Sequence, residues 1–207
     1  MLSRLILIVL ISLFSMRSGF AQQSQQIPSV TDRTLIISKI NDFFNSNPTM
    51  IADFLQITSD GRRSEGQLLV QKPGRMHFEY NPPEKIQIIA DGTSVAIRDK
   101  KLLTQDVYFI GQTPLKFLLS NHIDLSKDLR VLEVLSNKTS ISVLVEDKAT
   151  FGGTSRINLI FDPSTYQLKQ WTIIDPQGYQ TLVTLFNLDL KTKPDPSEFK
   201  INYEKFD

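Results

Sequence analysis

Apolar and polar residues alternate with the two-residue period of β-strands over most of this 207-residue chain. Within residues 66–92, Met76, Phe78 and Tyr80 alternate with polar or charged neighbours, directly after a break at Pro73-Gly74. Pro-Gly and Asp-Gly pairs between apolar runs indicate turns, because Gly accepts a positive φ and Pro presets the turn. The spacing predicts about ten strands, joined as consecutive antiparallel hairpins.

Two helical segments are expected to interrupt this pattern. Ser29 or Thr31 can cap a first helix that ends at Pro48, and its apolar residues recur at helical spacing, which predicts packing on a core. Thr113 is predicted to cap a second helix with Pro114 at its first position. This helix has only about two turns and is too short to be stable alone, so we expect it to lie on an apolar surface. The first apolar stripe consists of Ile36, Ile40, Phe43 and Phe44.

Late strands carry apolar residues on both faces. Val183 and Leu185 fall on one face of their strand, and Leu182 and Phe186 fall on the other. One face of a simple antiparallel sheet should be polar. We therefore predict a mainly β fold whose sheet is curved and either packed on both sides or left with a concave face for a helix or ligand. The tail, residues 193–202, is predicted to end in a short strand.

The N-terminal residues 1–21 have the pattern of a secretory signal peptide. Arg4 precedes an apolar run over residues 5–14, and Gly19 and Ala21 make a plausible cleavage site. An uncleaved membrane anchor is the alternative, but the run has only about 10 residues against the roughly 20 that span a bilayer. Residues 22–28 are predicted to be a disordered lead-in, and residues 29–207 a single domain.

Composition removes several classes of function. The absence of cysteine excludes disulfides, thiolate metal sites, a cysteine nucleophile and a lipid-modified cysteine anchor, so a cleaved product is expected to be soluble. Lys and Arg (23) balance Asp and Glu (22), which gives no sign of a nucleic-acid or polybasic membrane surface. His77 is predicted to be a solvent-facing strand residue, and His122 to follow the short helix. No catalytic motif occurs, so we expect no catalytic residue, cofactor or metal.

The remaining signal is an apolar surface. Gly66, Leu68, Val70 and Lys72 share one face of a strand, and Met76, Phe78 and Tyr80 face the same interior if the turn keeps register. An ordinary core explains this pattern, and so does an adaptable apolar wall that receives a ligand. The pattern alone leaves both interpretations open.

Residues 66–97, "GQLLVQKPGRMHFEYNPPEKIQIIADGTSVAI", resemble the outer-membrane lipoprotein carrier proteins, the LolA family. The shared pattern runs from Gly through an apolar strand to a basic residue before Pro, then through an aromatic-rich strand, a Pro and a strand ending in Asp-Gly. Upstream "IADFLQ", downstream "GQTPLKFLL" and the late hairpin "QLKQWTIIDPQGYQTLVTL" are also similar to the family, so the resemblance spans nearly all of the chain after residue 21.

The resemblance implies an incomplete antiparallel β-barrel of ten to eleven strands, with an N-terminal helix and short lid helices over a cavity. It implies a monomeric periplasmic chaperone that takes lipoproteins from an inner-membrane ABC transporter, shelters their acyl chains and passes them to an outer-membrane receptor. Lys72 would contact the lid, where the family often has Arg; lysine is a point charge and bonds several carbonyls less well. The implied cavity wall is Phe54, Leu68, Val70, Met76, Phe78, Tyr80 and Ile88, and the implied lid is Leu115, Phe117, Leu118 and Leu119.

Other functions remain open. A relative on the same fold could carry another lipid or sense lipoproteins, and a secreted hydrolase is a candidate from a different class. The unpaired strand edges of an open barrel also suggest a heterodimer or scaffold role.

Overall fold

The structure, a computed structural model, describes residues 26–114, 116–150 and 152–203. The predicted signal peptide lies outside these residues. The helices are α1 (Val30–Ser46), η1 (Ile110–Gln112), η2 (Lys116–Leu119), α2 (Leu125–Asp128) and η3 (Pro196–Phe199). The strands are β1 (Thr49–Thr58), β2 (Arg63–Gln71), β3 (Arg75–Tyr80), β4 (Ile86–Asp91), β5 (Ser94–Asp99), β6 (Thr104–Phe109), β7 (Arg130–Ser136), β8 (Ile141–Thr150), β9 (Gly153–Phe161), β10 (Leu168–Ile174) and β11 (Gln180–Asp189).

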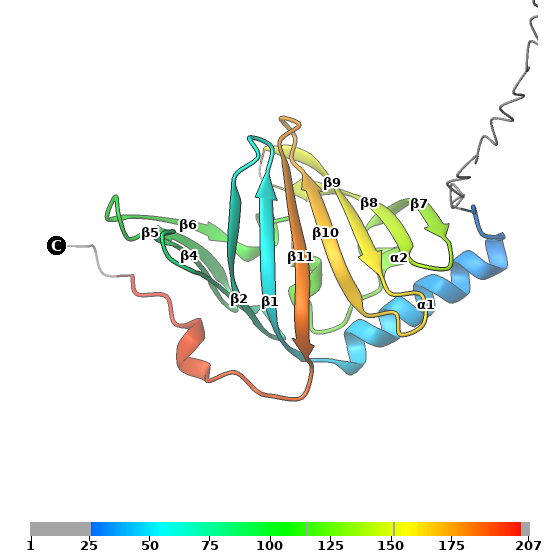
Figure 1. Ribbon diagram of the computed structural model, residues 1–207, viewed down its shortest axis with the longest axis horizontal. Helices are drawn as coiled ribbons and strands as arrows, with labels where there is room; N and C mark the ends of the chain where they lie inside the picture. Colours follow the sequence, from blue (N-terminus) through cyan, green and yellow to red (C-terminus); the bar gives the residue numbers. More distant parts are fainter. Residues whose placement is uncertain (1–25, 115, 151, 204–207) are drawn as a thin grey trace, which may run out of the picture.

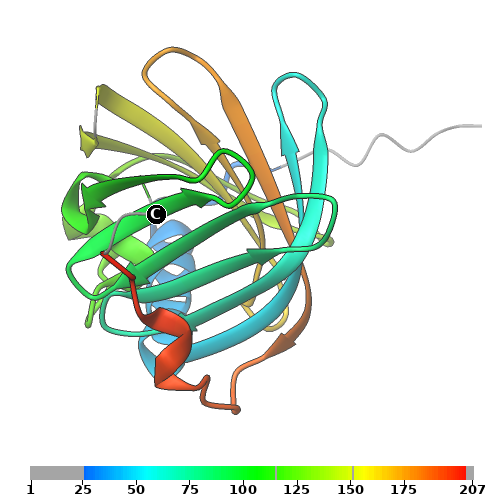
Figure 2. The ribbon, with the colours of Figure 1, turned by 90° about the vertical axis from the view of Figure 1, so that its left-hand side faces the viewer.

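All the strands form one 11-stranded antiparallel sheet in the order β6-β5-β4-β3-β2-β1-β11-β10-β9-β8-β7. Consecutive strands pair as hairpins within β1–β6 and within β7–β11. The two halves join where β11 pairs with β1, with Phe54 opposite Leu185. The sheet curves strongly, so that β6 and β7 are its two edges (Figures 1 and 2). The prediction of a mainly β, incomplete antiparallel barrel is confirmed.

Helix α1 fills part of the concave side. Ser29 is its N-cap and accepts a hydrogen bond from the backbone N–H of Asp32 at 3.2 Å. Its predicted apolar stripe is buried, and the ring of Phe44 lies edge-on to Phe161 of β9, with centroids 5.9 Å apart. The helix ends at Ser46, two residues before Pro48, as the sequence predicts.

The segment between β6 and β7 differs from its prediction. Two short 3₁₀ helices, η1 and η2, replace the expected α-helix. Thr113 is the C-cap of η1 rather than the N-cap of the expected helix, and its hydroxyl donates to the carbonyl oxygen of Ile110 at 2.8 Å. Phe117, Leu118 and Leu119 are nevertheless buried in the main core, because so short a segment is held by packing rather than by its own hydrogen bonds. We call residues 111–120 the lid.

The C-terminal segment was predicted to end in a strand and instead forms η3. It lies on the convex side of the sheet against β3 and β4 (Figures 1 and 2). Phe199 is buried there, as are Leu69, Ile89 and Ala96 on the strands beneath. The same covering makes the prediction for His77 wrong: its side chain faces the convex side, as its strand phase requires, but only 4% of the residue is exposed.

Two smaller findings complete the description of the fold. Gln26 forms a bridge with Ser136, with backbone N–O distances of 3.1 and 3.0 Å. Within the described part of the chain, no helix combines the length and the apolar character that crossing a membrane requires.

Gly66 is a position where the fold requires the absence of a side chain. A Cβ atom there would lie 2.0 Å from the backbone carbonyl oxygen of Glu79 on the neighbouring strand. Because backbone rather than a flexible side chain blocks the space, we predict that Gly66→Ala lowers the free energy of unfolding by about 3 kcal/mol or more.

Gly111→Ala is the matched control, since a Cβ at Gly111 meets nothing within 4 Å. This variant should stay within about 0.5 kcal/mol of the wild type in urea denaturation. Equal stabilities for the two variants would contradict the close packing of β2 against β3.

Candidate functional site

The glycine at position 66 lets two aromatic rings meet above the sheet. Phe54 of β1 and Tyr80 of β3 are its cross-strand neighbours on either side. Their rings lie edge-on with centroids 5.1 Å apart, and Phe78 lies 5.1 Å from Phe54. Edge-on aromatic pairs at this separation are favourable beyond the area they bury. The cluster therefore forms a stiff apolar floor on the concave face, in the half of the sheet that α1 does not fill.

An apolar cavity of about 220 Å³ opens beside this floor. Strands β3, β4, β5, β10 and β11 supply most of its wall, and the start of the lid closes it with Thr113 and Pro114. Ligand sites in proteins usually measure about 300–1,000 Å³. The cavity is thus small for any long-chain ligand. Its lining residues are Gln56, Met76, Phe78, Tyr80, Ile88, Val95, Ile97, Thr113, Pro114, Trp171, Ile173, Thr181 and Val183.

The structure separates the seven residues expected in the cavity wall into two groups. Met76, Phe78, Tyr80 and Ile88 line the cavity. Phe54, Leu68 and Val70 share the concave face with them but are packed in the core. All seven are on the predicted face, because the Pro73-Gly74 turn keeps the register and places Leu68 opposite Phe78.

Sequence reasoning missed the part of the wall that comes from β5, β10 and β11. The sequence contains a pattern that indicates these residues: Trp171 and Ile173 are two positions apart, as are Thr181 and Val183, so each pair falls on one face of its strand. These strands pair with Trp171 opposite Val183 and Ile173 opposite Thr181, on the concave side. Only the pairing of β11 with β1 brings this late hairpin to the cavity, and the sequence pattern does not reveal that long-range pairing.

The lid residues fall into different environments. Leu115 lies outside the described residues. Phe117 and Leu119 line a second hollow of about 450 Å³ with Pro73 and Gly74, on another side of the lid from the apolar cavity. Leu118 is packed in the core. Different parts of the lid thus line different hollows. Thr113 and Pro114 line the apolar cavity, whereas Phe117 and Leu119 line the second hollow.

Polar contacts hold the second half of the lid and the chain that follows it. The ammonium group of Lys116 lies 3.1 and 3.0 Å from the two carboxylate oxygens of the buried Asp147 on β8. The backbone N–H of Gly74 donates to the carbonyl oxygen of Leu119 at 2.8 Å. Beyond the lid, Ile123 exchanges hydrogen bonds with the side chain of Asn45 in α1 at 2.8 and 2.9 Å. Opening the lid therefore requires the Lys116–Asp147 ion pair and the Gly74–Leu119 bond to break.

Lys72 does not contact the lid through its side chain. Its ammonium group donates to the carbonyl oxygen of Phe44, in the last turn of α1. Carbonyl groups at a helix C-terminus lack helical partners and carry partial negative charge, which favours a cation there. The partner of Lys72 is thus a carbonyl group at the end of a helix, as expected, but that helix is α1 and not the lid. Burial of the half-buried side chain lowers the pKa of Lys72 to about 8.

Tyr80 brings a hydroxyl group to the apolar wall. The hydroxyl donates to the side-chain oxygen of Gln56 on β1 at 2.9 Å. Burial raises the pKa of Tyr80 to about 12, so the phenol remains neutral at any physiological pH. This neutral pair keeps the cavity free of charge.

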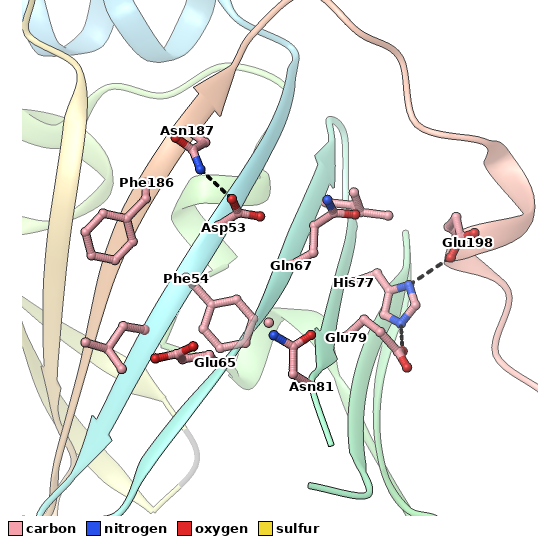
Figure 3. Close-up of a pocket in the computed structure, with 13 residues that line it drawn as sticks. Asp53, Phe54, Glu65, Gln67, His77, Glu79, Asn81, Phe186, Asn187 and Glu198 are labelled. Carbon is pink, nitrogen blue, oxygen red and sulfur yellow. Dashed lines mark hydrogen bonds and ion pairs between the residues drawn. The ribbon is translucent and has the colours of Figure 1, made fainter. Parts of the chain in front are cut away.

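A larger groove of about 900 Å³ lies on the convex face, beside the C-terminal segment (Figure 3). Its lining includes the carboxylates of Asp53, Glu65, Glu79 and Glu198. The imidazole of His77 bridges two of them, with Nε2 3.0 Å from Glu79 and Nδ1 3.2 Å from Glu198. Despite its size, the groove is unsuited to apolar chains, because burying carboxylates against hydrocarbon is costly.

The concave cavity and the convex groove are lined by different chemical groups. Among the residues that the structure describes, no three His, Asp or Glu side chains converge as metal ligands would. The convex groove has carboxylates but no nucleophile beside the histidine, and the concave cavity has no titratable group apart from Tyr80. The chemistry that the concave site supports is the burial of apolar groups from water.

Known proteins point to the same chemistry. The family model described as "Outer membrane lipoprotein carrier protein LolA" matches residues 45–202, which include all eleven strands. The chain belongs to this family. A LolA-family protein from Legionella pneumophila (strain Lens), named outer-membrane lipoprotein carrier protein, is 29% identical over 190 residues, covering 88% of this chain and 91% of that protein. A protein of the same name from Methylobacillus flagellatus is 26% identical and covers 73% of this chain and 77% of its own length.

Among solved structures, a LolA-superfamily protein from Nitrosomonas europaea is similar, with a TM-score of 0.47, 10% identity and coverage of 83% of this chain and 98% of that one. The LolA family consists of periplasmic carriers rather than enzymes.

The pKa of Lys72 gives a testable pH dependence. Its folded-state pKa of about 8 lies below the ordinary value of 10.5. Between these values the unfolded chain binds the proton and the folded protein does not, so this group makes the protein more stable as pH rises from 8 towards 10.5. The gain should be on the order of 1 kcal/mol, because water still reaches and screens the half-buried ammonium group.

The measurement is urea denaturation of the wild type and Lys72→Met at pH 7, 8, 9 and ~10, since the variant cancels all other titrations. The stability of the wild type relative to the variant should rise above pH 8. A difference that stays constant over this range would show that the ammonium group is as well solvated in the fold as in the unfolded chain.

Proposed function

We propose that this protein is a periplasmic chaperone that carries lipoproteins towards the outer membrane with their acyl chains in the concave cavity. The observation that carries the proposal is the apolar cavity itself, which is uncharged, lies under a latched lid and belongs to a LolA-family chain. An inner-membrane ABC transporter would supply the cargo and an outer-membrane receptor would accept it.

The size of the cavity means that loading must enlarge it. A volume of about 220 Å³ does not hold even one long acyl chain, and lipoproteins carry several. Space can come from movement of the lid, which the Lys116–Asp147 and Gly74–Leu119 contacts hold in place. It can also come from Met76, whose unbranched side chain adapts to irregular surfaces. The chains would then replace the lid as cover for the aromatic floor.

The energetics require a weak grip. Each methylene group taken from water gains about 0.8 kcal/mol, so three fully buried chains would gain on the order of 30 kcal/mol. This exceeds the limit of about 18–21 kcal/mol for non-covalent affinities. Three effects lower the net free energy of binding. The lid has to open, Lys116 has to separate from Asp147, and part of the acyl chains stays in solvent. A carrier needs this reduction, because cargo held at full strength would never be released.

The cavity assignment predicts the behaviour of two matched variants. Ile97 of β5 lines the cavity and is 40% exposed. Val107 of β6 is 43% exposed but stands opposite Ala96, on the convex face. Because both positions are partly exposed, Ile97→Glu and Val107→Glu should fold with similar stability. Ile97→Glu should bind a synthetic diacylated lipopeptide about tenfold or more weakly, since its carboxylate would lie among acyl chains without a partner.

Val107→Glu should bind the lipopeptide like the wild type. Binding is measured by displacement of a fluorescent apolar probe, with circular dichroism and thermal unfolding as the check on folding. Unchanged binding by Ile97→Glu, in a folded protein, would remove the cavity from the proposed function. Equal losses in both variants would indicate a general effect of charge on the sheet edge.

A further inference from the structure

One polar group in the cavity wall is left without a partner. Trp171 is 1% exposed, and its indole Nε1 atom is buried without a hydrogen-bond acceptor among the described residues. Two other donors in the wall are matched: the hydroxyls of Tyr80 and Thr113 donate to Gln56 and Ile110. Trp171 is also the only tryptophan of the chain.

An unmatched buried N–H group is uncommon, because water has been removed from it and nothing replaces the lost hydrogen bond. The nearest recorded ring, that of Phe78, lies edge-on to Trp171 with centroids 6.4 Å apart, which offers at most a weak N–H contact with a π-face. A bound water would need two to four polar partners, whereas Trp171 lies directly opposite Val183 in the sheet and beside the ring of Phe78. Among the described residues, the surroundings therefore supply no acceptor in this structure.

The position of the indole ring suggests what does supply one. The ring belongs to the cavity wall, between Leu159 of β9 and Val183 of β11 in the sheet. Loading requires the lining side chains to move, since the closed cavity is smaller than an acyl chain, and this movement can uncover the N–H group. A hydrocarbon chain has no acceptor, whereas the carbonyl oxygen at the head of an acyl chain accepts a hydrogen bond from an indole.

We infer that Trp171 donates a hydrogen bond from Nε1 to an acyl carbonyl oxygen of the bound lipid, and so distinguishes ester-linked acyl chains from plain alkyl chains. This assignment rests on the proposed function and adds a ligand class to it. It places the carbonyl head of one chain inside the cavity, rather than only the methylene tail. The apolar wall supplies affinity, and the single donor supplies the preference for acyl groups.

The test compares two lipids that differ only in their carbonyl groups. One is a diacylglyceryl-cysteine peptide with two ester-linked chains, and the other is its ether-linked dialkyl analogue of equal chain length. Both are titrated against the wild type by displacement of a fluorescent apolar probe. The wild-type protein should prefer the ester by on the order of tenfold.

The matched variant replaces Trp171 with benzothienylalanine, which has the same shape but carries sulfur in place of the N–H group. It can be placed at this position alone, because a culture lacking tryptophan incorporates it only where tryptophan would stand. The variant should bind the ether lipid like the wild type and lose the preference for the ester. Trp171→Phe serves as a second, genetically encoded variant with the same expectation. Resonance Raman spectra should show a shift of the indole N–H band with the ester lipid only.

Each outcome has a distinct meaning. Equal affinities of the wild type for ester and ether, or a preference that survives in the benzothienylalanine protein, would overturn the role of Trp171 and leave the carrier function intact. Failure to bind either lipid would overturn the proposed function itself. An ester and ether pair of phospholipids, titrated in the same way, identifies the source of the carbonyl. If the protein prefers the ester phospholipid as strongly as the ester lipopeptide, Trp171 recognises any acyl ester. If it prefers the ester only among lipopeptides, the recognised carbonyl belongs to a lipoprotein.

Discussion

The need to cover the concave apolar face of the sheet explains the placement of α1 and of the lid. Eleven strands present more inward-facing apolar surface than one helix can cover. Helix α1 packs on the part formed by β7–β10, where Phe44 meets Phe161. The other part is covered only by the lid and by its own aromatic cluster around Gly66. A fold that leaves this surface incompletely filled gains a place for an apolar ligand.

In the proposed function, closure of the lid and loading of the cavity are alternatives to one another. Acyl chains would then take the place of Phe117 and Leu119, which are buried by the same loss of contact between apolar surface and water. For the lid to move, the free energy of ligand binding would have to exceed that of polar contacts such as Lys116–Asp147. The convex side differs, because η3 and Phe199 cover the apolar residues of β3 and β4 there and the lining of the remaining groove includes four carboxylates.

The fold followed from local signals because alternation and turn residues determine hairpins. The Pro73-Gly74 turn determines which face Met76 and Phe78 occupy, so four residues of the cavity wall could be predicted with their orientation. What failed depends on contacts between distant segments. His77 has the expected strand phase, but the C-terminal segment, more than a hundred residues later, buries it. The ammonium group of Lys72 donates to a carbonyl oxygen at a helix C-terminus, as its charge favours. Nothing in the sequence, however, shows that this helix is α1 rather than the lid. The unpartnered indole of Trp171 likewise becomes visible only when β10 and β11 are placed beside β1.

We propose that acyl chains occupy the concave cavity after the lid has moved. The decisive measurement is photo-crosslinking with a lipopeptide that carries a diazirine near the end of one acyl chain, followed by mass spectrometry of the labelled protein. We expect labels on residues of the concave wall such as Met76, Ile88 and Val183. Labels concentrated on the convex groove, at Leu55 or Phe186, would contradict it.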